Sequence, residues 1–532
     1  MVVTDFFMST PAVINPAEMS LGAKVLAFSV MCVGFFIALL DIQIVSASLA
    51  EIGGGLSAGP DEIAWVQTSY LIAEIIVIPL SAWLSRVVST RWLFCFSAIG
   101  FTATSLLCGW AWDIKSMIIF RALQGFLGGS MIPTVYTTAF FYFQNQQRVI
   151  AAAVVGGLAS MAPTFGPTIG GWITDHYSWH WLFFVNLVPG TLVAVLVPIL
   201  VRVDKPDVSL LKGADYPGMV LMAVALGCLE YTLEEGPRWN WFEDSTIATT
   251  AWIAGLSSVG FVWRSLTFHN PIVDLRALKN LNFALGCFFS FVSGIGLFAT
   301  IYLTPLFLGR VRGYSALQIG ESIFSTGIFQ LLAIPFYAML ARRVDLRWLM
   351  MFGLACFTAG LWEFTPITHD WSWKELLLPQ GLRGFSQQFT LAPIITLTLG
   401  GLPPARLKSA SGLFNLMRNL GGAIGIAACG TILNDRLNLH FSRLASHLTP
   451  ANATFEETYQ TLTARFTAST GDAIHGQAMA LKRLWDLTFR EAQVQTFADA
   501  FLAISVCLAV ATVMVPLLRK VEPPKVAPAD AH

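Results

Sequence analysis

Five acidic residues stand inside long apolar segments of this chain, where charged groups are rare. They are Asp41, Glu74, Glu230, Glu321 and Glu363. Because a charge in hydrocarbon is costly, each carboxyl must be paired, be protonated or face a wet cavity. An isolated carboxyl in such surroundings holds a proton more readily than it does in water, which is what a proton carrier requires.

The depth of these charges can be counted along a helix at about 1.5 Å per residue. The count places Asp41 and Arg121 level with each other in the outer half of the membrane, so we expect an ion pair between them. It places Glu74 close to the midplane. We expect Asp41, Glu74 and Arg121 to serve proton coupling, and a purely structural role is the alternative. For Glu230, near the end of its span, we favour that structural alternative.

A second group of charges is expected in the C-terminal half. Glu321, Glu363 and Arg383 lie towards the outer side of their spans, and Arg418 lies inside a later span. We expect these four residues to form a counterpart charge cluster. The alternative is again that they make structural ion pairs.

The segments that hold these charges are long enough to cross a membrane. The chain has 532 residues, of which 55% are hydrophobic and 12% charged, and its mean hydropathy is +0.64. About twenty apolar residues in a helix cross about 30 Å of hydrocarbon. The sequence therefore predicts an all-α integral membrane protein with about fourteen spans. They lie near 22–48, 62–84, 92–111, 116–140, 149–173, 181–201, 216–234, 246–267, 282–309, 315–341, 347–366, 376–400, 407–433 and 496–518.

The chain also repeats itself. "IPLSAWLSRVVSTRWLFCF" (78–96) returns as "IPFYAMLARRVDLRWLMMF" (334–352), at a constant offset of 256 residues. This offset carries the second span onto the tenth, which predicts two six-helix bundles with two extra helices between them. The basic turns that follow these two spans are expected to act as hinges, and they contain Arg86, Arg91, Arg342 and Arg347.

Basic residues predict the orientation. Eighteen Lys and Arg residues lie on the side of the termini, against five in the short loops opposite. By the positive-inside rule both termini are cytoplasmic. The predicted parts are a cytoplasmic N-terminal segment (1–21), an N-terminal six-helix bundle (22–201), a linker with two extra transmembrane helices (202–267), a C-terminal six-helix bundle (268–433 and 496–518), an extracytoplasmic loop (434–495) and a cytoplasmic tail (519–532).

Other classes of function find no support in the residues. The eight cysteines fall within spans at no metal-like spacing, and none of the eight histidines stands in mid-span. We therefore expect no metal site, no cofactor and no enzyme active site. No G-x-x-x-x-G-K-S/T string occurs, so ATP-driven transport is not expected, and neither is a nucleic-acid partner.

Small residues gather in "GGLASMAPTFGPTIGGWI" (156–173). Prolines bend helices and glycines permit close backbone approach, so this stretch is expected to break at Pro163, pack tightly and pivot. The residues concerned are Pro163, Gly166, Pro167, Gly170 and Gly171.

Four stretches carry a resemblance to a known family. "LLDIQIVSASLA" (39–50) is similar to a first-helix motif, and "RALQGFLGGSMIPT" (121–134) to a fourth-helix motif that includes Arg121, Gln124 and Gly125. "APTFGPTIGG" (162–171) is similar to a fifth-helix antiporter motif, and "TLGGLPPARLKSASGLFNLMRNLGGAIG" (398–425) to the EmrB branch. The chain resembles the major facilitator superfamily, and within it the fourteen-helix drug:proton antiporters of the EmrB/QacA type, over residues 25–435 and the last span.

The resemblance implies a function. It implies a proton-driven antiporter of the inner membrane that exports lipophilic or aromatic drugs and toxic compounds from the cytoplasm or inner leaflet. It also implies a periplasmic membrane fusion protein and an outer-membrane channel as partners. The 434–495 loop is then either a dock for this adaptor or a hairpin lying over the bundle. An uncoupled facilitator, a sensor or a proton-coupled importer on the same fold is the alternative.

One motif departs from the family. The loop after the second helix usually has glycines and an aspartate, but Ala82, Arg86 and Ser89 stand there in this chain. The acidic partner that would lock this loop by charge is missing. Asp345, in the second copy, is the candidate to supply part of it.

Overall fold

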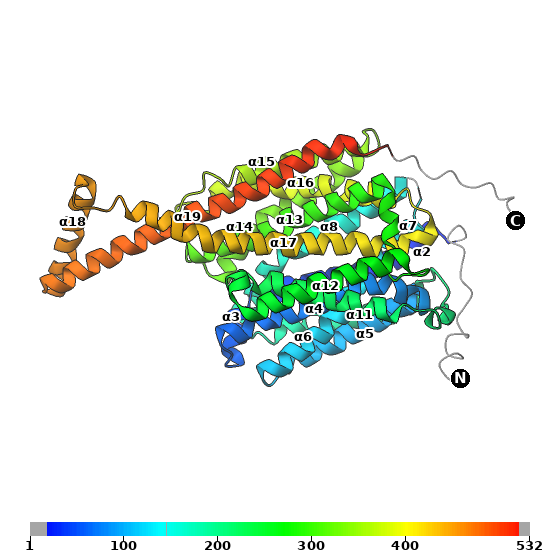
Figure 1. Cartoon of the computed structure of the whole chain (residues 1–532). Coiled ribbons are helices and arrows are strands. Elements are labelled where there is room, and N and C mark those ends of the chain that lie inside the picture. Colours follow the sequence, from blue (N-terminus) through cyan, green and yellow to red (C-terminus); the bar gives the residue numbers. More distant parts are fainter. Residues whose placement is uncertain (1–18, 145, 521–532) are drawn as a thin grey trace.

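Long apolar helices run back and forth between two faces of the molecule, as the hydropathy pattern predicts (Figure 1). The computed structural model describes residues 19–144 and 146–520, and these residues form helices joined by short connections. We call the face on which α2 begins and α19 ends the terminal face. Most of the predicted N-terminal segment (1–21) and tail (519–532) lies outside the described residues.

The first half of the chain forms one helix bundle. Its helices are α2 (Leu21–Ser46), α3 (Leu49–Gly55), α4 (Pro60–Val87), α5 (Thr90–Gly109), α6 (Ile114–Gly129), α7 (Met131–Tyr142), α8 (Gln146–His176), α9 (Trp181–Phe184) and α10 (Leu187–Leu200). α6 and α7 together make one crossing, and so do α9 and α10.

The remaining helices follow in the same manner. They are α11 (Tyr216–Glu235), α12 (Ser245–Thr267), α13 (Leu281–Arg310), α14 (Ala316–Leu340), α15 (Leu346–Trp362), α16 (Trp373–Leu399), α17 (Pro404–Ala445), α18 (Ala453–Thr470) and α19 (Ala473–Met514). Short 3₁₀ turns occupy Val208–Leu211, Trp241–Glu243, Leu275–Lys279 and Val515–Leu517.

Among the described residues, twelve crossings are long and apolar enough to span a membrane by length and composition alone. α15 has 17 residues, and α16 carries several buried polar side chains, so neither meets that test. Both pack within the bundle, α15 against α16 and α16 against α14. With these two included, the fourteen predicted spans are accounted for.

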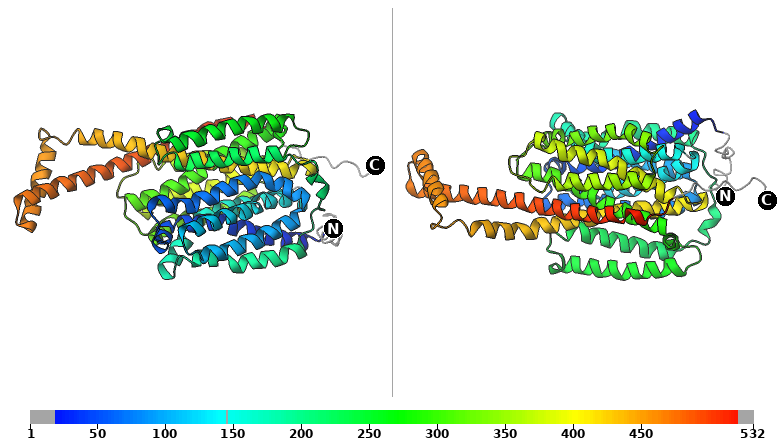
Figure 2. Two further views of the ribbon diagram at one scale, coloured as in Figure 1. Left: turned by 60° about the horizontal axis from the view of Figure 1, so that its bottom comes forward. Right: turned by 90° about the horizontal axis from the view of Figure 1, so that it is seen from above.

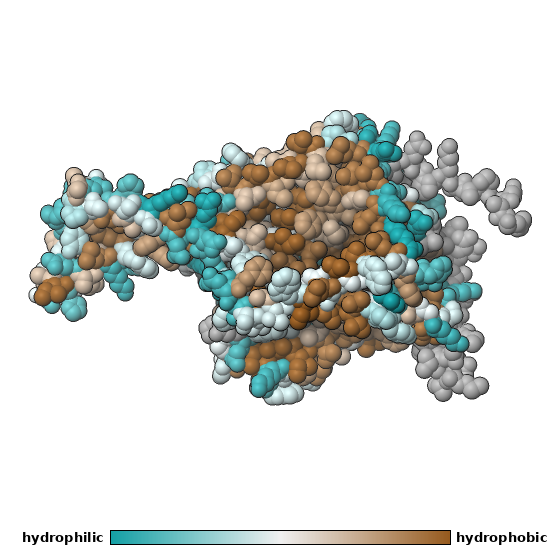
Figure 3. Space-filling model, viewed as in Figure 1, coloured by the Kyte–Doolittle hydropathy of each residue, from teal (hydrophilic) through white to brown (hydrophobic). Residues whose placement is uncertain are grey.

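A broad apolar belt covers the face of the bundle seen in Figure 3, and polar residues lie at its ends. The helix most exposed to this belt is α12, where Trp252, Leu256 and Val259 are each more than 70% exposed. Apolar side chains can be exposed to lipid without a cost in free energy, since hydrocarbon is as apolar as they are.

The repeated stretches fold alike. Pro79 lies inside α4 and Pro335 inside α14, and each helix is followed by a tight turn. Ser89 caps α5 and Asp345 caps α15 at the same offset of 256 residues. Ser89 adopts φ 76°, a left-handed conformation that glycine adopts at least cost, which fits the glycine that the family motif has in this loop.

The two halves meet along a few helices. α8 of the first half packs against α14 and α16 of the second, and α4 and α7 pack against α17. These contacts form the surface on which one half can move against the other.

Residues 434–495 form a projecting helical hairpin (Figures 1 and 2). α17 and α19 have 42 residues each, about 63 Å at 1.5 Å per residue, which is twice the thickness of the hydrocarbon. Of the two alternatives for this segment, a hairpin lying over the bundle is wrong, because both helices continue beyond the bundle and carry α18 at their tip (Figure 1).

Candidate functional site

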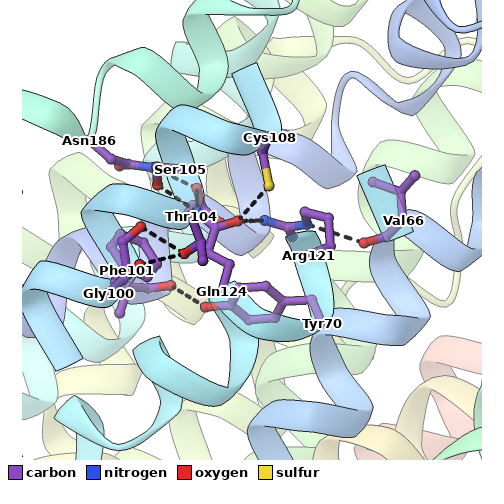
Figure 4. Close-up of polar contacts among 12 residues, drawn as sticks. Val66, Tyr70, Gly100, Phe101, Thr104, Ser105, Cys108, Arg121, Gln124 and Asn186 are labelled. Carbon is purple, nitrogen blue, oxygen red and sulfur yellow. Dashed lines mark hydrogen bonds and ion pairs between the residues drawn. The ribbon is translucent and has the colours of Figure 1, made fainter. Parts of the chain in front are cut away.

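The most deeply buried charges of the molecule form one hydrogen-bonded network (Figure 4). Arg121 on α6 and Asp41 on α2 have no exposed side-chain surface, and Arg121 Nη1 lies 2.6 Å from Asp41 Oδ2. Gln124 Nε2 donates to Asp41 Oδ1 at 3.1 Å, and Asn186 Nδ2 donates to the same oxygen at 2.6 Å. Gln124 also donates to Ser105 of α5 at 2.7 Å. The predicted ion pair is thus present, and its carboxylate has three donors.

The guanidinium of Arg121 is also held from the other side. Its Nε donates to the carbonyl of Val66 at 3.2 Å, and its Cζ lies 4.3 Å from the centre of the Tyr70 ring. α6 approaches α4 closely at the same level, because a Cβ on Gly125 would lie 2.3 Å from the Tyr70 carbonyl oxygen. Only glycine permits this approach, which brings Arg121 to its partners.

Glu74 lies elsewhere, in a cavity between the two halves. It is 3% exposed and lines a space of ≈ 740 Å³, open solvent included, of which ≈ 80 Å³ admits water, together with side chains of α2, α8, α11, α13 and α17. The cavity is partly enclosed and narrow, with only a small part wide enough for water. From the second half, Arg418 and Asn419 face the same space.

Arg418 connects the halves across this cavity. Its Nη1 donates to the hydroxyl of Tyr136 on α7 at 2.8 Å, and its side chain is 2% exposed. A buried cation from one half and a buried carboxyl from the other therefore face one space.

The predicted second charge cluster is wrong. Glu321 and Glu363 are exposed, whereas Arg383 is buried and donates to Thr326 at 3.2 Å. Arg418 belongs to the central cavity instead. A count of residues along a helix does not give the direction in which a side chain points around the helix axis, and Glu363 lies just beyond the end of α15.

Among the described residues, Glu230 does not make the structural ion pair favoured for it from the sequence. Within the described residues its carboxyl makes no ion pair, and the side chain is 5% exposed and lines the central cavity. The neighbouring Glu234 lines it too, and this residue was not singled out from the sequence.

The small residues of α8 produce close packing, as predicted. A Cβ on Gly166 would lie 2.3 Å from Gln43 Cβ, and one on Gly170 would lie 2.7 Å from the Ile44 carbonyl oxygen. The expected break at Pro163 is absent, because α8 runs unbroken from Gln146 to His176 with Pro163 and Pro167 inside it. Gly171 is buried in the same helix. Whether α8 pivots stays a prediction.

The comparisons with known proteins agree with this architecture. The family model described as Major Facilitator Superfamily matches residues 31–434. The chain belongs to this superfamily. The proton:xylose symporter XylE shares the fold with a TM-score of 0.59 at 11% identity, over 94% of this chain and 97% of that one.

Two relatives show to which type within this superfamily the chain belongs. The colistin resistance protein EmrB of Acinetobacter baumannii is 39% identical over 439 residues, which cover 82% of this chain and 86% of the relative. The multidrug export protein EmrB of Haemophilus influenzae is 30% identical over 439 residues with the same coverage. The predicted membership of the EmrB type is confirmed. The chain is a multi-pass transporter of the inner membrane and not an enzyme.

The four predicted hinge arginines lie in different surroundings. Arg91 is buried and lies 5.0 Å from the Trp92 ring, Arg86 is half-buried and Arg342 is exposed. Arg347 pairs with Asp345 at 2.9 Å. The hydrogen bonds that the Arg347 side chain donates to the Asp345 carboxylate hold the pKa of Asp345 below its ordinary value. Asp345 therefore serves its own half and does not replace the acidic group missing from the first copy.

The missing acidic group comes from the linker after α10. Asp204 accepts hydrogen bonds from the backbone N–H of Thr90 at 3.0 and 3.1 Å, at the start of α5. It also pairs with Lys408 of α17, whose Nζ donates to the Ser85 carbonyl at 2.9 Å. Asp204 thus ties the two halves together at the terminal face. Asp204 is 114 residues from Thr90, and no local pattern in the sequence marks it.

Removing one member of the buried pair is expected to be costly. Arg121→Ala leaves Asp41 buried without its cation and should lower the free energy of unfolding by about 3–5 kcal/mol. Arg121→Ala combined with Asp41→Asn should recover part of this loss, because the remaining amide is neutral. Thermal unfolding in detergent measures both variants. The control is Arg436→Ala, which breaks an exposed pair with Asp499 and should change stability by less than about 1 kcal/mol. No recovery in the double variant would contradict the account.

The contact between Asp204 and Lys408 should hold the terminal face closed. Asp204→Asn removes the charge attraction, so the terminal face should open more often. A Ser411→Cys reporter suits the measurement, since Ser411 contacts Thr137 across the halves at 2.8 Å. In a background without the native cysteines, labelling by a hydrophilic maleimide should become several-fold faster. Asp207→Asn is the matched control, because among the described residues the carboxylate of Asp207 bonds to Ser209 of its own turn alone. Equal labelling in all three proteins would overturn the assignment.

Proposed function

We propose that this chain is a proton-driven antiporter that exports lipophilic or aromatic drugs and toxic compounds from the cytoplasm or inner leaflet. The observation that carries the proposal is the cavity between the halves, in which Glu74 of the first half faces Arg418 and Asn419 of the second. A group that changes charge at this interface alters the attraction between the halves. Proton binding can thereby favour one conformation over the other.

Glu74 is the proton-binding group in this proposal. It faces open space and lies close to a cation, so its charge is felt by both halves. Asp41 has three hydrogen-bond donors and does not line the cavity. Asp41, Arg121 and Gln124 accordingly position the helices of the first half around Glu74. The sequence alone did not separate these two roles, since Asp41 and Glu74 were equal candidates for binding the proton.

The proposed transport cycle depends on competition between proton and substrate for the cavity that contains Glu74. A proton from outside binds Glu74 and weakens its attraction to Arg418, which favours opening at the terminal face. Substrate entering from the cytoplasm or inner leaflet displaces the proton, and the return motion carries the substrate out. Because proton and substrate compete, the two flows are obligatorily opposed.

We place the terminal face in the cytoplasm. This assignment rests on the excess of basic residues on that side, eighteen against five, and it places both termini in the cytoplasm. The projecting hairpin of α17, α18 and α19 then stands on the periplasmic side (Figure 1).

The hairpin is the proposed dock for a periplasmic membrane fusion protein that leads to an outer-membrane channel. Its helices carry exposed apolar side chains well away from the bundle, among them Ile474 at 77% and Trp485 at 51% exposure. Exposed apolar surface of this kind is typical of an interaction site. The projection also gives an adaptor room to contact the transporter without touching the membrane.

Transport in liposomes tests the proposed function. The purified protein is reconstituted with a pH-sensitive dye inside and an imposed proton gradient, and lipophilic cations and aromatic acids are added. Proton movement triggered by a compound should occur with the wild type and fall to background in Glu74→Gln. Glu363→Gln, which changes an exposed carboxyl, should behave as wild type. Compound flux without proton movement would indicate a facilitator, and proton-driven uptake in the opposite direction an importer. Binding without flux would indicate a sensor.

Docking is tested on the exposed apolar side chains from which it is argued. Ile474→Ser combined with Trp485→Ser removes two of them and leaves α17, α18 and α19 in place. Transport in liposomes should be unchanged, while resistance of whole cells to exported compounds should fall to the level of cells without the gene. Unchanged resistance would contradict docking on these side chains.

A further inference from the structure

Of the two extra helices, only α11 reaches the central cavity. It packs against α4 of the first half and α17 of the second, with α12 on its outside (Figure 1). Tyr231 of α11 stacks on Trp65 of α4 at 5.4 Å. α11 is therefore part of the wall of the cavity, whereas α12 faces lipid.

The outer end of α11 is fixed to the second half. Trp241 Nε1 donates to Thr431 Oγ1 of α17 at 2.9 Å, and Asn434 Nδ2 donates to the Pro237 carbonyl at 2.5 Å. These bonds set the rotation of α11 about its axis. The side chains that α11 presents to the cavity are consequently held in place from both halves.

Two of those side chains are carboxyls on one face of the helix. Glu230 and Glu234 are four residues apart, about 6 Å along the axis, and both line the cavity that holds Glu74. Glu230 is 5% exposed, and its Oε2 has no hydrogen-bond partner among the described residues. The next residue, Glu235, points elsewhere and is bonded to Trp239 at 3.2 Å and paired with Arg238 at 3.9 Å.

The charges that line the cavity do not balance. Three carboxyls, those of Glu74, Glu230 and Glu234, share it with one guanidinium, that of Arg418. Arg418 is already bonded to Tyr136, and Arg121 is paired with Asp41 outside the lining. A buried carboxylate without a cation is costly in an apolar medium, and a positively charged ligand removes that cost.

The rest of the lining defines the remainder of such a ligand. Side chains such as Leu39, Leu71 and Phe298 make most of the wall apolar. A ligand that matches both the apolar wall and the unpaired carboxyls has an apolar or aromatic body and one ammonium or guanidinium group. Glu230 and Glu234 lie near the outer end of α11, so this group would lie on the outer side of Glu74.

We propose that Glu230 and Glu234 form a cation-recognition subsite that α11 adds to the central cavity, and that this subsite selects amphipathic organic cations. The proposal rests on the proposed export function, since it names a substrate class for the same cavity. It also gives one of the two extra helices a chemical role.

Equilibrium binding to the detergent-purified full chain tests the subsite without any proton gradient. Ethidium, a permanent aromatic cation, and Nile red, a neutral aromatic compound, are the probes. Glu230→Gln combined with Glu234→Gln should raise the Kd of ethidium about tenfold or more and leave that of Nile red unchanged. Glu230→Asp, which keeps the charge, should retain most of the ethidium affinity. Glu235→Gln, on the same helix but outside the cavity, should bind both probes as wild type does.

Several results would overturn the subsite. One is unchanged ethidium affinity in the double variant, or absent ethidium binding in the wild type. Another is equal loss of both probes, which would indicate a structural role. A third is a double variant that binds both probes as wild type does but no longer moves protons in liposomes with either compound. That result would indicate that the two carboxyls conduct protons and do not bind the substrate. Failure of the export function itself is seen separately, as wild-type binding without compound-driven proton movement.

Discussion

The cost of burying charge in a membrane governs this molecule. Where that cost is fully offset, as at Asp41 and Arg121, the charges hold helices together. α2, α5, α6 and the segment before α10 each contribute a group to this network, so the first half is bound into one unit. Where the cost is not offset, as at Glu74 and Glu230, the carboxyl faces a cavity and is available to a proton or a ligand. The same physical rule thus distinguishes the charges that hold helices together from the carboxyls that can bind a proton or a ligand.

The contacts between the halves show how such a structure can move. They run along α8, α14, α16 and α17 and are polar at several points, with Asp204 and Lys408 at the terminal face and Tyr136 with Arg418 in the middle. Polar contacts of this kind can be exchanged for others when one half moves against the other. The glycines of α8 bring its backbone close to that of α2, which ties α8 to the first half.

Much of the fold was predictable because hydropathy and repetition report directly on spans. The ion pair of Asp41 and Arg121 was predictable as well, since the rise of a helix fixes depth. Rotation about the helix axis and the end of α15 were not predictable from one sequence, and this is why Glu321 and Glu363 were wrongly placed in a cluster. The spacing of Glu230 and Glu234 by four residues was a usable signal, because it puts both carboxyls on one face. Asp204 had no such signal, since its partners Thr90 and Lys408 are remote in the chain.

The central claim is that protonation of Glu74 changes how the two halves meet. Spin labels at Gln147 on α8 and at Arg343 after α14 would report the distance between the halves at the terminal face, since both positions are exposed. Distances measured by electron paramagnetic resonance should lengthen when the buffer is changed from alkaline to acidic. In Glu74→Gln the longer distance should prevail in both buffers. A distance that ignores pH in the wild type, or that still responds to pH in Glu74→Gln, would contradict the account.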